Sequence, residues 1–146
     1  MFTKLLLASD GSDYALRAAQ AAAAIAKSMG ASVTVLHVFS APLLQMTAPG
    51  APGMDIDPGA VNDYMEQVQD SVARRTGRIL EEAGVAYDTL TEVGHPAEVI
   101  TRIAEDDGYD LIVLGSRGMT PIKSFLLGSV SDKVSHHAHC PVLIVK

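Results

Sequence analysis

The sequence predicts an α/β protein in which five strands alternate with four helices and form a mainly parallel sheet. Short apolar, strand-like runs alternate with helical segments along the whole chain. Two of these runs, Lys4–Ser9 and Asp110–Gly115, are almost continuously apolar, as strands buried on both faces of a parallel sheet are. The length of 146 residues suits one domain spanning residues 1–146.

The first 38 residues have the size of one right-handed βαβ unit. The strand Lys4–Ser9 stops at the polar turn Asp10-Gly11-Ser12. An alanine-rich helix over Asp13–Met29 follows, and Gly30 occupies the position where a helix end favours a left-handed residue. Ser32–Val38 is rich in β-branched residues and is predicted to be the second strand.

The middle of the chain is predicted to hold a long connection, a helix and an edge strand. Ser40–Ala60 contains four of the seven prolines and no sustained periodicity, which predicts a long mobile connection within one domain. Apolar residues three or four apart over Val61–Glu82 predict an amphipathic helix. Val85–Val93 is a weaker strand, in which exposed Asp88 and Glu92 would suit the edge of a sheet.

The last third of the chain continues the alternation. Pro96 suits the first turn of a helix that ends at Asp106-Asp107-Gly108. The strand Asp110–Gly115 and a loop come next. A helix over Ser129–Ala138 and a strand over Pro141–Val145 complete the predicted fold.

Composition argues against several classes of protein. The chain has 11 Lys and Arg against 17 Asp and Glu, a formal net charge of −6, so we do not expect a nucleic-acid binder. No apolar run approaches the ~20 residues of a membrane span. The single Cys140 rules out an internal disulfide framework and fits a reducing compartment. With no signal-peptide pattern at its start, the chain is predicted to be cytoplasmic.

Three segments should meet where a ligand would bind. In an open parallel sheet, ligands bind beyond the carboxyl ends of the strands, at the point where the strand order switches. The segments are the turn Asp10-Gly11-Ser12, the strand end at Val38 and the loop after Leu114. This loop reads Gly115-Ser116-Arg117-Gly118, then nine residues, then Gly128-Ser129-Val130-Ser131.

The glycine-rich loop has the pattern of an anion site. Glycines let backbone N–H groups approach an anion without an intervening Cβ, and the unpaired N–H groups of a helix N-terminus attract negative charge. Ser129 is expected to cap the following helix, with Asp132 completing a capping box. The spacing alone also fits a tight structural loop, and Asp10 alone also fits a turn or cap residue.

Taken together, these motifs resemble the universal stress protein family. The spacing Gly115-x2-Gly118-x9-Gly128-Ser129, the opening Asp10-Gly11-Ser12 and the ending Cys140-Pro141-Val142-Leu143-Ile144-Val145 follow the family's order on a matching α/β frame. The resemblance covers essentially the whole chain. In that family the complete glycine motif marks the ATP-binding branch, and this sequence keeps every glycine and the serine of the motif.

The resemblance implies a role for each motif. Asp10 would recognise the adenine or ribose end of ATP, the backbone at Val38 would bond to the adenine edge, and the later residues would surround the phosphates. The implied binding set is Asp10, Gly11, Ser12, Val38, Gly115, Arg117, Gly118, Gly128, Ser129, Val130 and Ser131. A Mg²⁺ or Mn²⁺ ion would be held mainly by the phosphates and water.

The resemblance also implies a homodimer through the last strand, at Val142, Leu143, Ile144 and Val145. Physical reasoning agrees, because this apolar strand would otherwise be a bare sheet edge that needs covering.

Several residues outside the motifs have two readings. Lys123 fits either a second counter-charge for phosphate beside Arg117 or a solvent-facing loop side chain. His37 is predicted to be packed or hydrogen-bonded in the core, and His95 fits either a ligand contact or a helix start. Two methionines of the proline-rich connection, Met46 and Met54, fit a soft lid or partner surface, or else flexible filler.

The histidines near the C-terminus have the composition of a metal site but not its spacing. His136, His137 and His139 with Cys140 lack the i, i+4 pairing of a zinc helix. We therefore predict no metal site there, but a polar helix end whose dipole favours histidine. Cys140 is predicted to be a small buried residue and not a nucleophile.

The predicted fold is doubly wound, with strand order 3-2-1-4-5 and helices on both faces. The chain has neither a P-loop lysine motif nor a dinucleotide fingerprint. The resemblance implies an ATP-binding stress-response protein that acts as a nucleotide-dependent regulator or sensor on an unknown downstream protein partner, and the missing motifs predict slow or no ATP hydrolysis. ATP would order Ser40–Ala60 and the Gly115–Gly128 loop. The alternatives are an ATPase or adenylyl-transfer enzyme, and a nucleotide-free dimerisation or chaperone-like module.

Overall fold

In the computed structural model, which describes residues 1–40, 57–118 and 127–146, five strands form one parallel sheet with the order β3-β2-β1-β4-β5. The predicted α/β class and strand order are confirmed, and the sheet is wholly rather than mainly parallel. The strands are β1 (Lys4–Ala8), β2 (Ser32–Ser40), β3 (Tyr87–Gly94), β4 (Leu111–Gly115) and β5 (Val142–Val145).

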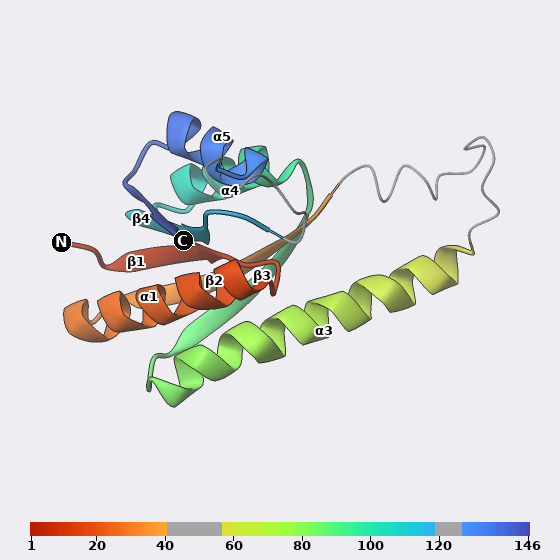
Figure 1. Ribbon diagram of the computed structural model, residues 1–146, viewed down its shortest axis with the longest axis horizontal. Helices are drawn as coiled ribbons and strands as arrows, with labels where there is room; N and C mark the ends of the chain where they lie inside the picture. The colour runs from red at the N-terminus through yellow and green to blue at the C-terminus, as the bar shows by residue number, and fades with distance from the viewer. Residues whose placement is uncertain (41–56, 119–126) are drawn as a thin grey trace.

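Helices cover both faces of the sheet. In the view of Figure 1, α1 and α3 lie below the strands and α4 and α5 lie above them. Within the described part of the chain the helices are α1 (Asp13–Met29), α3 (Pro58–Glu82), α4 (Pro96–Asp106) and α5 (Ser129–His137). Each pair closes one hydrophobic layer against the strands, as expected for a doubly wound fold.

The central strand β1 connects the two layers. Leu5, Leu6 and Leu7 are fully buried, and because side chains alternate along a strand they serve opposite faces. Leu5 and Leu7 pack in the layer of α1 and α3, whereas Leu6 packs in the layer of α4 and α5. The apolar run of this strand is therefore explained by burial on both sides. The ladder of small buried side chains on α1 lets that helix lie close to the sheet.

Several element boundaries differ from the sequence prediction, most of them by one or two residues. The helix predicted from Val61 begins at Pro58, because Asp57 caps it by accepting a hydrogen bond from the Gly59 N–H at 3.1 Å and Pro58 fits a first turn. The second strand extends to Ser40, which pairs with the end of β3. Residues 41–56 of the predicted connection, which include Met46 and Met54, lie outside the described residues.

The third strand is an edge strand, as predicted, but it begins at Tyr87 and not at Val85. Val85 instead packs into the layer of α1 and α3 before the strand starts. Asp88 is exposed, whereas Glu92 is half-buried and not exposed as expected. No helix in the described part of the chain has the length and apolarity that a bilayer span requires.

Candidate functional site

A cavity of about 510 Å³ opens at the carboxyl edge of the sheet, above β1 and β4. The strand order switches here, because β1 pairs with β2 on one side and with β4 on the other. Doubly wound proteins bind ligands at such a point. All the predicted binding residues except Gly11 and Ser12 line this cavity, namely Asp10, Val38, Gly115, Arg117, Gly118, Gly128, Ser129, Val130 and Ser131.

Gly11 and Ser12 shape the turn between β1 and α1 instead of lining the cavity. Asp10 Oδ1 accepts the Ser12 N–H at 2.9 Å, and Ser12 Oγ caps α1 by accepting the Ala15 N–H at 3.3 Å. Gly11 has a φ of +76°, and a Cβ there would lie 3.3 Å from Val72 Cγ2. The turn is thus fixed by its own hydrogen bonds and by a glycine that α3 covers.

Helix α3 holds the same turn through two polar side chains that the sequence analysis missed. Arg75 Nη1 donates to the Gly11 carbonyl at 2.6 Å, and the Thr76 and Ser9 hydroxyls are 2.8 Å apart in a buried hydrogen bond. Thr76 is fully buried, so its hydroxyl depends on this partner. Neither residue stands in a motif, and each reaches the turn from more than sixty positions away.

Glycines bring the backbone of the β4–α5 loop against its neighbours. A Cβ on Gly118 would lie 2.6 Å from Asp10 Oδ2, and a Cβ on Gly115 would lie 2.8 Å from the backbone carbon of Tyr14. Real Cβ atoms do not approach other atoms this closely, so a neighbour would have to shift in either case. At Gly115 the neighbour is the backbone of α1, whereas at Gly118 it is the tip of the Asp10 side chain, which moves at less cost. Gly115 therefore has the stronger steric reason to be glycine.

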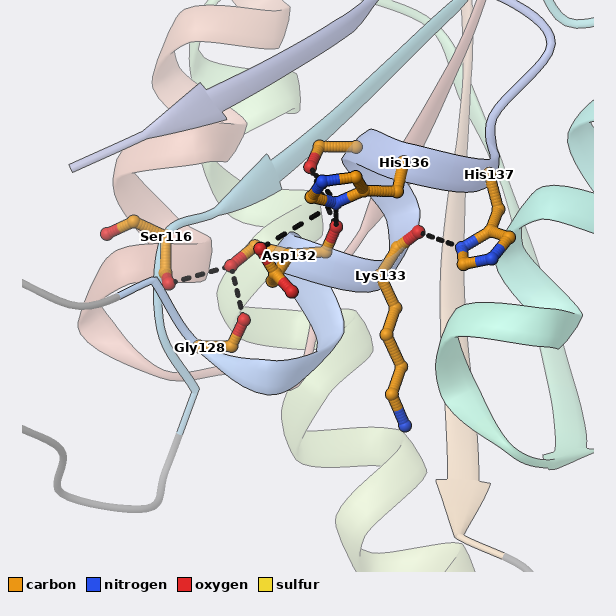
Figure 2. Close-up of polar contacts among 8 residues, drawn as sticks. Ser116, Gly128, Asp132, Lys133, His136 and His137 are labelled. Carbon is orange, nitrogen blue, oxygen red and sulfur yellow. Dashed lines mark hydrogen bonds and ion pairs between the residues drawn. The ribbon is translucent and has the colours of Figure 1, made fainter.

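Hydrogen bonds among Ser116, Gly128 and Ser131 join the two ends of the β4–α5 loop. Figure 2 shows Ser116 and Gly128 close to each other at this point. The Gly128 N–H donates to the Ser116 carbonyl at 2.7 Å. The buried Ser131 hydroxyl lies 2.9 Å from the Ser116 carbonyl and 3.0 Å from the Gly128 carbonyl, and its single proton serves these two acceptors. Ser131 lines the cavity, but its hydroxyl proton is used to close the loop.

The prediction that Ser129 caps α5 is wrong. Gly128 is the N-cap in an extended conformation, no side chain caps the helix, and Ser129 is its first residue. Because Ser131 bonds back to Gly128, the loop is closed without the capping box that Asp132 would have completed. The first-turn residues Ser129, Val130 and Ser131 line the cavity, and no side chain caps the backbone N–H groups at this end of α5.

Arg117 rests against α1 at the edge of the cavity. Its Nη1 atom donates to the Tyr14 hydroxyl at 3.1 Å, and its guanidinium carbon is 5.6 Å from the centre of the Tyr14 ring. Among the described lining residues, Arg117 is the single Lys or Arg and Asp10 is the single carboxylate. The other candidate counter-charge, Lys123, lies outside the described residues.

The cavity also has an apolar wall that the sequence analysis did not foresee. Leu36 of β2, Leu114 of β4 and the α4 residues Pro96 and Ile100 contribute to it. A largely apolar wall with a few convergent polar groups is typical of small-molecule sites. Periodicity marks these side chains as core, so the sequence gives no signal that they also face a ligand.

His37 is hydrogen-bonded in the structure, as predicted. Its Nδ1 atom lies 2.9 Å from the Ser9 carbonyl, and since a carbonyl only accepts, Nδ1 carries the proton. The ring packs edge-on against Phe39 with 4.6 Å between ring centres. The other histidine with two readings, His95, is exposed at the start of α4 and does not line the cavity.

The histidines of α5 bond to their own helix. In Figure 2, His136 and His137 turn back toward the carbonyls of Asp132 and Lys133, and both Nδ1 atoms lie 2.8 Å from those oxygens. This is the polar helix end that the spacing predicted. No cluster of three metal-binding side chains occurs among residues 1–40, 57–118 and 127–146. Burial raises the pKa of the Cys140 thiol, which keeps it protonated.

A doubly wound sheet with a glycine-walled cavity at its switch point is the architecture in which α/β proteins bind small ligands. The chain belongs to the universal stress protein family, whose model matches residues 1–146. Universal stress protein YxiE of Bacillus subtilis is 37% identical over 153 aligned residues that cover all of both chains.

Solved structures share this architecture over nearly the whole chain. The protein MJ0577 of Methanocaldococcus jannaschii is 30% identical, with a TM-score of 0.78, 100% of this chain covered and 96% of that one. A universal stress protein solved in complex with cAMP is 25% identical, with a TM-score of 0.74 and coverage of 99% and 97%. The family and fold expected from the motifs are therefore confirmed.

Proposed function

We propose that this protein binds ATP in the cavity at the carboxyl edge and acts as a nucleotide-dependent regulator in the stress response. One observation carries the proposal. Gly118 touches Asp10 so closely that a Cβ would collide with its carboxylate, which brings the turn proposed for the nucleoside and the loop proposed for the phosphates to one cavity. Glycines at both walls are what a backbone cradle for phosphates requires.

The lining residues suit the two ends of ATP. The apolar wall from β2, β4 and α4 offers a face for the adenine ring, and the strand end at Val38 offers backbone groups for its edge. The uncapped first turn of α5 and the guanidinium of Arg117 offer donors for phosphate oxygens. A solved relative in complex with cAMP supports an adenine nucleotide as the class of ligand.

A metal ion would accompany the phosphates without a protein cage. Asp10 is the single carboxylate among the described lining residues, and one of its oxygens already accepts the Ser12 N–H. Mg²⁺ prefers six oxygen ligands and readily keeps water. The donor set therefore fits Mg²⁺ or Mn²⁺ held by ATP and water, with no more than Asp10 from the described protein residues.

The polar groups that line the cavity also favour a sensor over an enzyme. A phosphoryl-transfer enzyme needs a positioned base or water-orienting group, and the single carboxylate among the described lining residues, Asp10, already accepts the Ser12 N–H through Oδ1. We infer slow or no hydrolysis. An ATPase or adenylyl-transfer enzyme would show steady turnover, and a nucleotide-free dimerisation or chaperone-like module would bind no nucleotide at all.

We also infer a cytoplasmic homodimer that signals to an unidentified protein partner. β5 is the last strand of the sheet, and Val142, Leu143, Ile144 and Val145 are all half-exposed. An apolar strand edge of this kind needs a covering partner, and a second copy paired across a two-fold axis provides one.

Nucleotide release from gently purified protein tests the proposal. We expect near-stoichiometric ATP by mass spectrometry after denaturation, and much less from Gly118→Asp, whose carboxylate would repel both the phosphates and Asp10. Gly59→Ala is the matched control, since a Cβ there makes only ordinary contacts. If none of the three proteins carries nucleotide, and calorimetry with ATP and Mg²⁺ detects no binding, the dimerisation module is the better description.

A further inference from the structure

Tyr14, in the first turn of α1, stands between two arginines. Arg117 Nη1 donates to its hydroxyl at 3.1 Å, and the guanidinium carbon of Arg117 lies 5.6 Å from the ring centre. The guanidinium of Arg17, from the same helix, lies 5.1 Å from that centre. Of the two cations, Arg117 lines the cavity and Arg17 does not. The tyrosine thus orients a guanidinium that faces the proposed ligand.

The same tyrosine supports the glycine loop at a second point. The backbone and Cβ of Tyr14 lie where a side chain on Gly115 would have to be, at 2.8 Å. Gly115 and Arg117 are two residues apart on the loop that the phosphates would contact. One residue of α1 therefore fixes both the path of the loop backbone and the direction of its arginine.

Charge gives Arg117 a role that the backbone N–H groups cannot have. The N–H donors of α5 are neutral, whereas Arg117 is the single fixed positive charge among the described lining residues. A guanidinium binds phosphate oxygens through a planar fork of donors, and its attraction grows with the negative charge of the ligand. A guanidinium already held by a phenol loses less side-chain freedom when it binds.

We propose that Arg117 makes the cavity prefer a nucleoside triphosphate over a monophosphate, and that Tyr14 is the positioning residue that holds Arg117 for this task. The inference rests on the proposed function, because it concerns the phosphate end of the same cavity. It assigns the selection of a ligand by its number of phosphates to Arg117, and the positioning of Arg117 to Tyr14, a residue outside every sequence motif.

The test is the ratio of the AMP and ATP dissociation constants, measured by calorimetry with Mg²⁺. Charge-assisted bonds to phosphate are strong, so Arg117→Gln should lower the ratio about tenfold by weakening ATP more than AMP. Arg117→Lys keeps the charge without the fork and should fall between wild type and Arg117→Gln. Tyr14→Phe keeps the ring and removes the hydroxyl, and we expect a loss of roughly threefold in the ratio.

Arg17→Gln is the matched control. It removes the other cation on the same ring without touching the cavity, and it should leave the ratio within about twofold of wild type. A merely structural tyrosine would lower the melting temperature of Tyr14→Phe without moving the ratio, and this result would overturn the role of Tyr14. An unchanged ratio in Arg117→Gln would overturn the role of Arg117.

The wild-type measurement separates this inference from the proposed function. If wild type binds no adenine nucleotide, the proposed function fails and the inference fails with it. If wild type binds ATP and AMP, and the ratio of the AMP and ATP dissociation constants is the same in Arg117→Gln as in wild type, the proposed function stands and the inference alone is wrong.

Discussion

At the amino edge of the sheet, polar groups find partners within the protein, whereas at the carboxyl edge several are directed to a cavity. Asp110 accepts hydrogen bonds from the Thr3 N–H at 2.8 Å, the Thr3 hydroxyl at 2.7 Å and the Lys4 N–H at 3.1 Å. Lys4 Nζ donates to the Asp107 carbonyl at 2.7 Å and lies 4.3 Å from the centre of the Tyr109 ring. These polar groups at the amino edge therefore bond to one another and not to a cavity.

The carboxyl edge is assembled differently. Its close approaches rely on missing side chains, as at Gly115 and Gly118, and its polar side chains support backbone turns. In this sheet, the groups at the amino ends of the strands serve stability, whereas the groups at the carboxyl ends shape the cavity. Changes at the carboxyl edge should alter ligand binding, while changes at the amino edge should alter the free energy of unfolding alone.

The largest effect is expected for Gly115→Ala. The new Cβ would lie 2.8 Å from backbone atoms of α1, which cannot move as a flexible side chain does. Overpacking of this kind costs about 1–3 kcal/mol of unfolding free energy, and the displaced loop should weaken ATP binding by at least about tenfold. Urea unfolding and calorimetry on the same samples measure both. Binding equal to that of wild type would show that the cavity does not depend on this contact.

Thr76→Val comes next and tests support from beneath the carboxyl edge. It replaces a buried hydroxyl with a methyl group and leaves Ser9 Oγ with the Gly11 N–H alone, at a cost of about 1–3 kcal/mol in unfolding free energy. The loosened turn should also weaken ATP binding severalfold. Thr76→Ser keeps the hydroxyl and is the matched control for binding. If Thr76→Val loses stability with unchanged ATP affinity, α3 does not influence the site.

These two residues illustrate what the sequence can and cannot reveal. Gly115 was identified because the loop motif is local and its spacing is written in consecutive residues. Thr76 was not, because its partner Ser9 is 67 positions away and nothing in a helix sequence marks one hydroxyl as buried. For the same reason the role of Tyr14 beside Arg117, 103 positions apart, is visible only in the fold.

The fold itself was more predictable than the site. Apolar runs such as Lys4–Ser9 report burial on both faces, and that pattern requires a parallel sheet between two helical layers. The start of α3 was missed although Asp57-Pro58 is a helix-start signal, because prolines nearby obscured it. The direction of the Ser131 hydroxyl was missed because the carbonyls of Ser116 and Gly128 compete with any ligand for its one proton. Only the folded positions of these carbonyls show which acceptor the hydroxyl uses.

Asp110→Asn is the counterpart at the amino edge. The amide nitrogen would face N–H donors that the carboxylate accepts. We expect a loss of about 1 kcal/mol in unfolding free energy, small because water screens this partly exposed group. ATP affinity should stay within about twofold of wild type, since the change lies at the opposite edge from the cavity. A clear loss of binding would mean that the two edges are not independent.

The smallest effect is a pH dependence at the same residue. Burial alone would raise the pKa of Asp110, but the hydrogen bonds from Thr3 and Lys4 outweigh it and lower the pKa. A carboxyl whose folded pKa lies below its unfolded value, about 3.9, stabilises the protein above that value. This stabilisation disappears as the pH falls through the folded pKa, because the Asp110 carboxyl is then protonated in both the folded and the unfolded state.

Urea unfolding of wild type and Asp110→Asn at a series of pH values tests this expectation. The difference in unfolding free energy between them should be constant at neutral pH and should narrow as the pH drops below about 4. The fall in stability of Asp110→Asn over the same range reports the remaining carboxyl groups. A difference that stays constant down to the acid transition would show that the three hydrogen bonds do not favour the charged form. Asp110 would then hold the Thr3 and Lys4 backbone equally well in its neutral and its charged form.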